Sequence, residues 1–538
     1  MTCTIQFCGA AGAVTGSCYR VMWEDKEFLV DCGLYQGPKT LKELNYRDFP
    51  FNPGRVDFLL LTHAHIDHSG LIPKLAGAGF TGPIYTTAAT CDLLSFMLPD
   101  SGNIQESEVR LLNRRNQQRG LKTVSPIYTQ EDAENVMRQL TSVDYDKWVK
   151  VAEGVRVRYW NAGHILGSAS IEIELGGDGD GKRPLRLLFS GDIGPEHKLF
   201  HPDPEAPLNL DYVICESTYG DRVREVLTPE ERRTRLGEIL DTALAKEGVV
   251  VIPAFSVERT QELLADISNL IDRPGARKPL VFLDSPLAIR ATKAFQDHAH
   301  ELENINGDGR IFNNEHFQFT NSVEESKAIN NYASGVVIIA ASGMCEAGRI
   351  RHHLKRRLWE EKDTILLTGY NAPGTLGALL EAGKTEVKIH GEDVKVRASI
   401  VKFDAYSGHA DANGLVEWVL DRRPISGAIF LTHGEPEGRD GLMRRLIAQG
   451  IDPSMLVAPQ LDEVFTLGPK EFKAAKGAPP RLAPAEIVKL DWHNDLAQLQ
   501  LDIREELDKA ADEKARAKII RRLRRALGDG GEENGKRD

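Results

Sequence analysis

Short apolar runs, each ending in a polar residue, recur through the first part of the chain. Residues 28–31 are Phe-Leu-Val-Asp, residues 58–62 are Phe-Leu-Leu-Leu-Thr, and residues 185–190 are Leu-Arg-Leu-Leu-Phe-Ser. Runs of this length are typical of β-strands that end in loops. Because sheets hold reactive side chains at strand ends, we expect the residues that follow these runs to form a site.

The pattern changes near residue 211. Strand-like runs now alternate with helical stretches, at residues 212–215, 249–252, 280–283, 335–339 and 364–367. This α/β rhythm predicts a mostly parallel sheet. After about residue 398 the short-strand pattern returns, and residues 429–432 end at His433. The simplest interpretation is one domain interrupted by another.

The last part of the chain has a different composition. Residues 469–484 are rich in Lys, Ala and Pro, which predicts a linker. Beyond it, apolar residues recur at helical spacing, at Trp492, Leu496, Leu499, Ile503 and Leu507, and a basic stretch follows. The apolar stripe predicts a helix that docks on the body or forms a homodimer with a second subunit. The basic end either contacts RNA or is simply solvated.

Length and charge restrict the classes of protein to which this chain can belong. A chain of 538 residues is expected to hold roughly two or three folded units. Its net charge of −12 requires any nucleic-acid contacts to be local. No apolar run is long enough to span a bilayer, and the seven cysteines include no Cys-x-x-Cys pair. We therefore expect a cytoplasmic protein in a reducing compartment, without a membrane partner or a thiolate metal site.

Three histidines and an aspartate lie within six residues, His63-Ala-His-Ile-Asp-His68. Zinc binds nitrogen and oxygen ligands of this kind. A tight turn after a strand can direct His63 and His65 to one ion, and Asp67 and His68 to a second. The alternative is a histidine-rich surface turn, but this density of ligands rarely arises by chance.

Further ligands are found downstream. His164 and Asp192 each follow a strand-like run and are flanked by glycines. An aspartate carboxylate can bridge two cations, which an imidazole cannot, so Asp192 is the candidate bridge. Asp31 follows the first run and is expected to orient ligands through hydrogen bonds. Alone, each of these residues is equally compatible with a turn.

In this order, residues 28–31, residues 63–68, His164 and Asp192 resemble the leading motifs of the metallo-β-lactamase superfamily. The resemblance covers residues 1 to about 210. It implies an αββα sandwich whose active site lies at one edge of the sheets. The superfamily alone does not determine the substrate, since its members hydrolyse lactams, thioesters and phosphodiesters.

Three later motifs indicate which branch of this superfamily the chain resembles. Glu216-Ser-Thr-Tyr-Gly, Ser407-Gly-His-Ala-Asp and Leu431-Thr-His-Gly-Glu resemble motifs A, B and C of the β-CASP nucleases. The similarity extends to about residue 465 and is closest to bacterial RNA-processing members related to the endonuclease subunit of the cleavage and polyadenylation factor. It implies an αββα sandwich interrupted by an α/β β-CASP cap domain, with a helical C-terminal extension. The predicted division is 1–210, 211–398, 399–465 and 466–538.

The resemblance also assigns roles within the site. His433 becomes the last ligand of the second of two zinc ions, and His409 the proton donor to the departing sugar oxygen, held by Glu216. Asp31 and Asp67 complete the catalytic set. The implied metal ligands are His63, His65, Asp67, His68, His164, Asp192 and His433. The substrate-binding candidates are Ser407, Ser285, Arg259 and Arg349.

The implied function is a zinc-dependent ribonuclease that hydrolyses phosphodiester bonds by a two-metal hydroxide mechanism. Single-stranded RNA would occupy the cleft between the domains. Whether cutting is internal, from the 5′ end, or both stays open, as do a DNA nuclease of the same family and a non-catalytic RNA-binding scaffold. Two positions depart from the family pattern: Glu258 stands where relatives usually have Gly, and Ala378 where they often have Arg.

Overall fold

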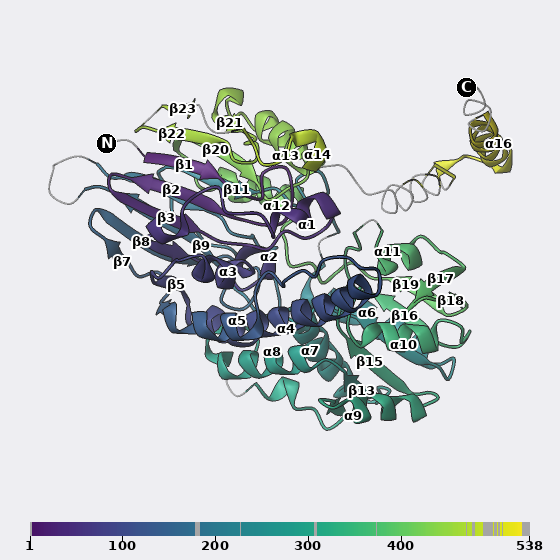
Figure 1. Ribbon diagram of the computed structural model, residues 1–538. Coiled ribbons are helices and arrows are strands. Elements are labelled where there is room, and N and C mark those ends of the chain that lie inside the picture. The colour runs from purple at the N-terminus through teal and green to yellow at the C-terminus, as the bar shows by residue number, and fades with distance from the viewer. Residues whose placement is uncertain are drawn as a thin grey trace.

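The computed structural model describes the chain apart from residues 1–2, 178–182, 226, 306–308, 373, 470, 476–478, 488–498, 500–502, 504–505, 508 and 530–538. Trp492 and Leu496, from the predicted apolar stripe, lie outside the described residues. Two mixed sheets stack face to face, and a third sheet with its own helices lies beside them (Figure 1). The expected αββα sandwich with an α/β cap is confirmed.

The first sheet has eight strands in the order β23-β22-β1-β2-β3-β4-β5-β6. Their bounds are β1 Cys3–Phe7, β2 Tyr19–Trp23, β3 Lys26–Val30, β4 Phe58–Leu60, β5 Ile84–Thr87, β6 Leu140–Val143, β22 Val464–Leu467 and β23 Phe472–Ala475. The second has seven, ordered β21-β20-β11-β10-β9-β8-β7. These are β7 Val149–Ala152, β8 Val155–Asn161, β9 Ala169–Leu175, β10 Leu185–Phe189, β11 Leu210–Glu216, β20 Ile425–Thr432 and β21 Leu456–Val457.

Apolar side chains from the facing surfaces hold these two sheets together. Phe7 and Phe28 of the first sheet belong to the same buried cluster as Phe189, Tyr212 and Phe430 of the second. Helices cover the two outer faces. The first sheet is covered by α1 Lys39–Leu44, α2 Ile66–Ser69, α3 Ile72–Gly77, α4 Ala88–Gln118 and α5 Gln130–Val136, and the second by α12 Ala412–Leu420 and α13 Pro436–Ala448. Loops at one edge of this sandwich carry the motif residues.

The third sheet is entirely parallel, in the order β14-β13-β15-β12-β16-β19. Its strands are β12 Val249–Pro253, β13 Leu280–Leu283, β14 Phe317–Phe319, β15 Val336–Ala340, β16 Thr364–Leu367 and β19 Ser399–Lys402. Alternate residues of β12 pack on opposite sides: Val250 and Ile252 face α6 and α7, and Val249 and Val251 face α10. Because both faces of the sheet are covered, the central strands β12, β13, β15 and β16 are largely apolar runs.

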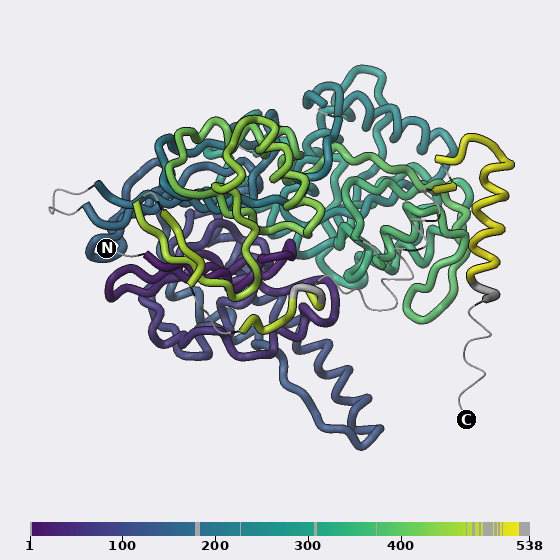
Figure 2. The backbone as a smooth tube through the Cα atoms, turned by 90° about the horizontal axis from the view of Figure 1, so that it is seen from above, coloured from purple at the N-terminus to yellow at the C-terminus, as the bar shows by residue number. Residues whose placement is uncertain are grey.

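The remaining elements are the helices and a small hairpin of the cap, and short 3-10 turns in both the sandwich and the cap. Its helices are α6 Pro229–Leu244, α7 Arg259–Ile271, α8 Pro286–Asp297, α9 Val323–Ala328, α10 Ile350–Arg357 and α11 Leu376–Glu381, and β17 Glu386–Ile389 pairs with β18 Glu392–Lys395. Short 3-10 turns are η1 Pro53–Arg55, η2 Met137–Gln139, η3 Ala299–Glu301, η4 Arg310–Phe312, η5 Ile329–Asn331 and η6 Pro453–Met455. Helix α4 contacts α8 and so joins the sandwich to the cap (Figure 1). Seen from above, the end of α4 and the segment after it project away from both (Figure 2).

The strand pairing differs from the predicted division at three places. Strand β11, placed with the cap from its sequence, pairs with β10 and β20 of the second sheet. Strand β19, placed with the returning sandwich, pairs with β16 of the cap. The predicted linker includes β23, which pairs with β22, and Arg481, whose guanidinium lies 2.9 Å from Asp462. The chain therefore leaves the sandwich after residue 216, returns after residue 402, and stays docked on it to about residue 487.

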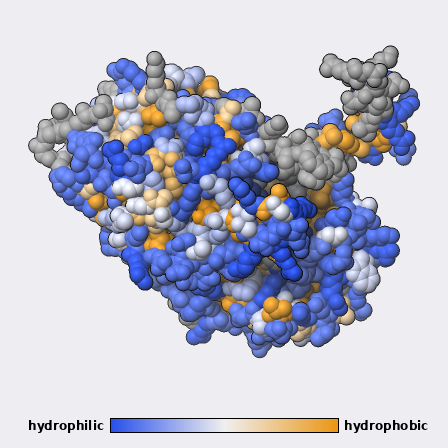
Figure 3. Space-filling view, in the orientation of Figure 1, coloured by the Kyte–Doolittle hydropathy of each residue, from blue (hydrophilic) through white to orange (hydrophobic). Residues whose placement is uncertain are grey.

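The described C-terminal region ends in α14 Pro484–Ile487 and α16 Glu513–Asp529. Helix α16 lies apart from the body in Figure 1. The prediction that this region forms a homodimer stays a prediction. Among the described residues, no helix is both long and apolar enough to cross a bilayer. The face shown in Figure 3 is largely hydrophilic, with small separate hydrophobic patches.

Candidate metal centre

The histidine-rich motif follows a buried strand. All three residues of β4 are buried, and the chain then turns through Thr62 into the four-residue helix α2, which carries Asp67 and His68. This turn packs tightly on the loop after β3. A Cβ atom at Gly33 would lie 1.6 Å from the carbonyl oxygen of Asp67, so only glycine fits at that position. The backbone thus presents four potential ligands in one short turn.

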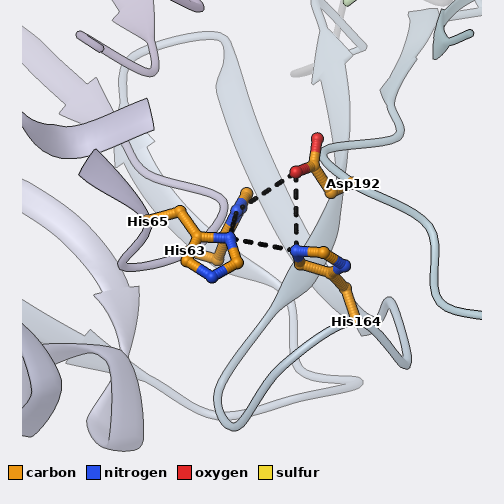
Figure 4. A group of neighbouring side chains, drawn as sticks. All are labelled: His63, His65, His164 and Asp192. Carbon is orange, nitrogen blue, oxygen red and sulfur yellow. Dashed lines mark hydrogen bonds and ion pairs between the residues drawn. The ribbon is translucent and has the colours of Figure 1, made fainter. Parts of the chain in front are cut away.

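One group of ligand atoms comprises His63, His65, His164 and Asp192, all within 4.8 Å of one another (Figure 4). His65 Nδ1 lies 3.2 Å from His63 Nε2 and 3.0 Å from His164 Nε2. Asp192 Oδ2 lies 3.5 Å from both His63 Nε2 and His164 Nε2. In Figure 4 the three rings and the carboxylate point toward a common centre.

A second group comprises Asp67, His68 and His433. The Nε2 atoms of His68 and His433 lie 3.1 Å apart, and His433 Nε2 is 3.5 Å from Asp67 Oδ2. The carboxylate of Asp192 joins this group to the first. Its Oδ1 lies 3.2 Å from His68 Nε2, while its Oδ2 faces the first group. One oxygen therefore faces each group, as expected for a bridging carboxylate.

Hydrogen bonds from outside hold the rings in these orientations. Asp31 Oδ2 lies 2.7 Å from His68 Nδ1, and Asp31 in turn accepts hydrogen bonds from the backbone N–H and hydroxyl of Thr62. The Nδ1 atom of His164 lies 2.6 Å from the carbonyl oxygen of Gly408. Anchoring one ring nitrogen leaves the other to face the centre, as in many zinc sites.

The electrostatics of the cluster suit cations. Burial lowers the pKa of His63 to about 3 and that of His65 to about 4, so both rings are neutral and offer a lone pair. Burial alone would raise the pKa of Asp192, but the surrounding histidines hold it well below its usual range. Oδ1 of this ionised carboxylate is buried and has no hydrogen-bond partner among the described residues. A buried carboxylate oxygen of this kind fits a metal ion. It faces His68 and His433, whose pKa values burial alone would lower but the surrounding carboxylates raise, so an ion bound there would take the place of their protons.

The motif B histidine lies at the rim of the cluster. His409 Nδ1 is 3.2 Å from Glu216 Oε1, and its Nε2 is 4.0 Å from Asp192 Oδ2. The Glu216 side chain is fully buried and accepts a hydrogen bond from the backbone N–H of Ile193, whereas the His409 side chain is 21% exposed. His409 is thus fixed at one nitrogen and open to an incoming group at the other.

The predicted substrate-binding residues divide into two pairs. The hydroxyl of Ser407 accepts a hydrogen bond from the His409 N–H at 3.3 Å, and Arg259 Nε donates to the carbonyl oxygen of Tyr406. Ser407 therefore lies beside His409, and Arg259 contacts the segment that carries it. Ser285 instead caps α8, and Arg349 donates to Asp284 and to backbone carbonyls within the cap. The structure gives the second pair contacts internal to the cap.

One buried charge cluster was not predicted from the sequence. Lys198 Nζ donates to the carbonyl oxygen of His164 at 2.6 Å and lies 2.9 Å from Glu258 Oε1. His201 Nε2 is 2.8 Å from Glu258 Oε2, and all three side chains are buried. The backbone of Glu258 has φ 72° and ψ −70° and is spanned by a hydrogen bond from Arg259 N to Val257 O. This is a strained γ-turn, which fits the expected preference for Gly here. Ala378, the other residue that departs from the family pattern, is buried in α11.

Comparisons with known families agree with this arrangement. Residues 11–233 match the metallo-beta-lactamase superfamily, residues 260–380 the Beta-Casp domain, and residues 393–456 the Zn-dependent metallo-hydrolase RNA specificity domain. A crystal structure of a protein of unknown function from Enterococcus faecalis aligns with 87% of this chain and all of that chain, at a TM-score of 0.50 and 13% identity. That likeness concerns the fold alone.

Curated relatives extend the match over most of the chain. Ribonuclease TTHA0252 of Thermus thermophilus is 34% identical over 83% of this chain and 96% of its own length. Transcription termination factor FttA of Thermococcus kodakarensis is 30% identical over 79% of this chain, which spans 66% of that factor. An RNase J-like protein of Methanocaldococcus jannaschii is 29% identical over 80% of this chain and 92% of its own length.

Proposed function

This chain is a β-CASP member of the metallo-β-lactamase superfamily, and we propose that it is a zinc-dependent ribonuclease. One observation carries the proposal. The carboxylate of Asp192 faces a ligand group on each side and also lies 4.0 Å from His409 Nε2. Two metal positions and a proton donor are therefore within reach of a single substrate phosphate.

We assign the two ligand groups to two zinc ions. His63, His65 and His164 would hold one ion, and Asp67, His68 and His433 the other, with Asp192 shared. Zinc ions bound there would make bound water acidic enough to ionise near neutral pH and would neutralise charge on the phosphate oxygens. The neutral rings of His63 and His65 and the ionised Asp192 already have the protonation states that an ion in the first group needs. In the second group the pKa values of His68 and His433 are raised, so an ion bound there would displace their protons.

Side chains and backbone groups of the protein then hold the proton donor and the metal ligands in position. The Glu216 carboxylate accepts a hydrogen bond from His409 Nδ1–H, so Nε2 faces the cluster. In its imidazolium form His409 can donate the Nε2 proton to the departing sugar oxygen. The Asp31–His68 contact and the Gly408–His164 contact keep the ligands in place. Gly408 belongs to the same loop as His409, so proton donor and metal ligand share one support.

RNA is the favoured substrate among the open alternatives. The matched RNA specificity domain spans residues 393–456 and contains both His409 and His433. The relative from Thermus thermophilus, which is matched over 96% of its length, is named a ribonuclease. Motif C carries a histidine, as in the RNA-acting members that this chain resembles. These points support RNA over DNA, and the complete ligand set supports catalysis over a scaffold role.

The test is incubation of zinc-loaded protein with 5′-labelled and internally labelled single-stranded RNA, and with DNA of the same sequence. We expect RNA to be cut and DNA to stay largely intact, with the label pattern revealing internal or 5′-end cutting. Asp192→Ala is the control and should leave RNA intact. Intact RNA in every lane would refute the proposal, and equal cutting of DNA would favour the alternative nuclease.

A further inference from the structure

One edge of the cap sheet faces the metal centre. Strands β12, β16 and β19 are parallel neighbours, so their carboxyl ends lie at the same edge. The segment after β19 runs from that edge to His409, and Gly408 in it contacts His164. The segments after β12 and β16 carry Phe255 and Tyr370. Ligands commonly bind at this edge of parallel sheets.

Each of these two aromatic rings is paired with an arginine. The guanidinium of Arg222 lies 5.1 Å from the centre of the Tyr370 ring, and that of Arg259 lies 4.8 Å from the centre of the Phe255 ring. The Phe255 side chain is 38% exposed and the Arg222 side chain 48% exposed. The Phe255 ring and the Arg222 guanidinium are therefore the solvent-facing members of the two pairs.

Each pair is linked to the proposed proton donor through one neighbouring residue. Tyr370 packs edge-on against Tyr219, whose ring lies 5.7 Å from that of His409. On the other pair, Arg259 Nε donates to the carbonyl oxygen of Tyr406, three residues before His409. The two aromatic–arginine pairs thus reach His409 through different neighbours, one through Tyr219 and the other through the Tyr406 backbone.

The charges favour stacking over phosphate binding. Asp221 Oδ2 lies 3.5 Å from Arg222 Nε, and the guanidinium of Arg259 is fixed by the Tyr406 carbonyl. Arg222 thus has a carboxylate beside it, and Arg259 has its Nε engaged, and both guanidinium groups are held over aromatic rings. Unpaired RNA bases, in contrast, stack on aromatic rings and on guanidinium planes, whatever their sequence.

We propose that Tyr370 with Arg222 and Phe255 with Arg259 are two stacking platforms for the unpaired bases on either side of the scissile phosphate. The inference rests on the proposed ribonuclease function and makes single-stranded RNA its substrate class. A paired base cannot reach a platform, so double-stranded RNA would be cut poorly. Little sequence preference is expected, because every base offers a flat face.

The test is kcat/KM for a single-stranded RNA cut at one site, compared with RNAs lacking the base on the 5′ or the 3′ side of that site. We expect each missing base to lower kcat/KM about fivefold or more. On intact RNA, Phe255→Leu should lower kcat/KM by a similar factor. In this variant, a missing base on one side of the site should cause no further loss. Tyr370→Leu should show the same behaviour for the other side. Tyr370→Phe keeps the ring and should retain the penalty for the missing base that Tyr370→Leu abolishes.

Trp359→Leu is the matched control. Trp359 is a 51% exposed aromatic residue of the same cap, but it precedes β16 and so lies at the opposite edge of the sheet. It should leave kcat/KM unchanged on every RNA. Equal cleavage with and without the flanking bases would overturn the platforms while leaving the ribonuclease proposal intact. A uniform loss in Phe255→Leu and Tyr370→Leu on all RNAs would also overturn them, and no cleavage of intact RNA would overturn both proposals.

Discussion

His409 Nδ1 lies 3.2 Å from Glu216 Oε1, although the two residues are 193 positions apart in the chain. Glu216 ends a strand of the sandwich, and His409 follows the last strand of the cap. Their contact therefore forms only when both parts of the chain are folded. It fixes the imidazole so that its second nitrogen faces the metal cluster.

His409→Ala should lower kcat for RNA cleavage by about 10²- to 10⁴-fold, because the departing oxygen loses its proton donor. Replacing that oxygen by sulfur removes the need for a proton, so this substrate should restore most of the rate in His409→Ala. The measurement is single-turnover cleavage of the two substrates. His352→Ala, an exposed histidine of the cap, is the control and should match wild type on both. An equal loss on the sulfur substrate would show that His409 does not donate the proton.

Zinc content should fall stepwise when the two ligand groups are altered separately. Wild type should bind two ions, and His65→Ala and His433→Ala about one tightly bound ion each, because each variant loses one ligand of one group. Asp192→Ala affects both groups and should bind least. Metal analysis after dialysis measures this directly. Two tightly held ions in His433→Ala would contradict the assignment of the second group.

Glu258→Gln should lower the free energy of unfolding by about 3 kcal/mol, because Lys198 and His201 would remain buried without their carboxylate. Burial alone would raise the pKa of Glu258, but His201 and Lys198 outweigh it and hold that pKa at about 2. Urea denaturation of zinc-loaded protein is the measurement.

Glu247→Gln is the matched control for this change. Glu247 also has a positive φ, of 55°, but its side chain is exposed. Its replacement should change the free energy of unfolding by no more than about 0.5 kcal/mol. Equal effects of the two substitutions would show that the buried ion cluster does not stabilise the fold.

His298 should contribute stability that disappears at high pH. Hydrogen bonds to Glu301 and Asp92 raise its pKa from 6.5 to about 9. The folded protein thus holds this proton more tightly than the unfolded chain, so the contribution is full below pH 6.5 and is lost as pH rises through 9. Because the Asp92 side chain is 62% exposed, we expect at most about 1 kcal/mol.

The corresponding measurement compares melting temperatures at pH 6 and pH 10. His298→Gln should melt below wild type at pH 6 and together with it at pH 10. His300→Gln changes a 72% exposed neighbour and should melt close to wild type at both values. A deficit in His298→Gln that persists at pH 10 would contradict the assigned role of its charge.

Local sequence motifs, through the family that they resemble, were sufficient to predict the architecture and to find the residues that converge at the centre. The family resemblance and the αββα sandwich with its cap are confirmed. All seven predicted ligands meet in two joined groups, because each follows a strand at the same edge. Their roles as zinc ligands stay a proposal.

The domain boundaries could not be found in the same way. Strand β11 is buried on both faces between two parallel neighbours, so its apolar run looks like a strand of the cap. Lys198 lies in a loop, and nothing in its local sequence shows that its ammonium is buried against Glu258. Long-range pairing decides both features, and a single sequence does not display it.

If two metal ions at this site cleave RNA together, activity must depend on both of them. The most direct test titrates chelator-treated protein with zinc and follows cleavage of an internally labelled single-stranded RNA against the number of ions bound per chain. We predict no cleavage without metal and a rate that rises steeply with the second ion and levels off at two. Intact RNA at two bound ions, or unchanged cleavage after metal removal, would contradict the two-metal ribonuclease proposal.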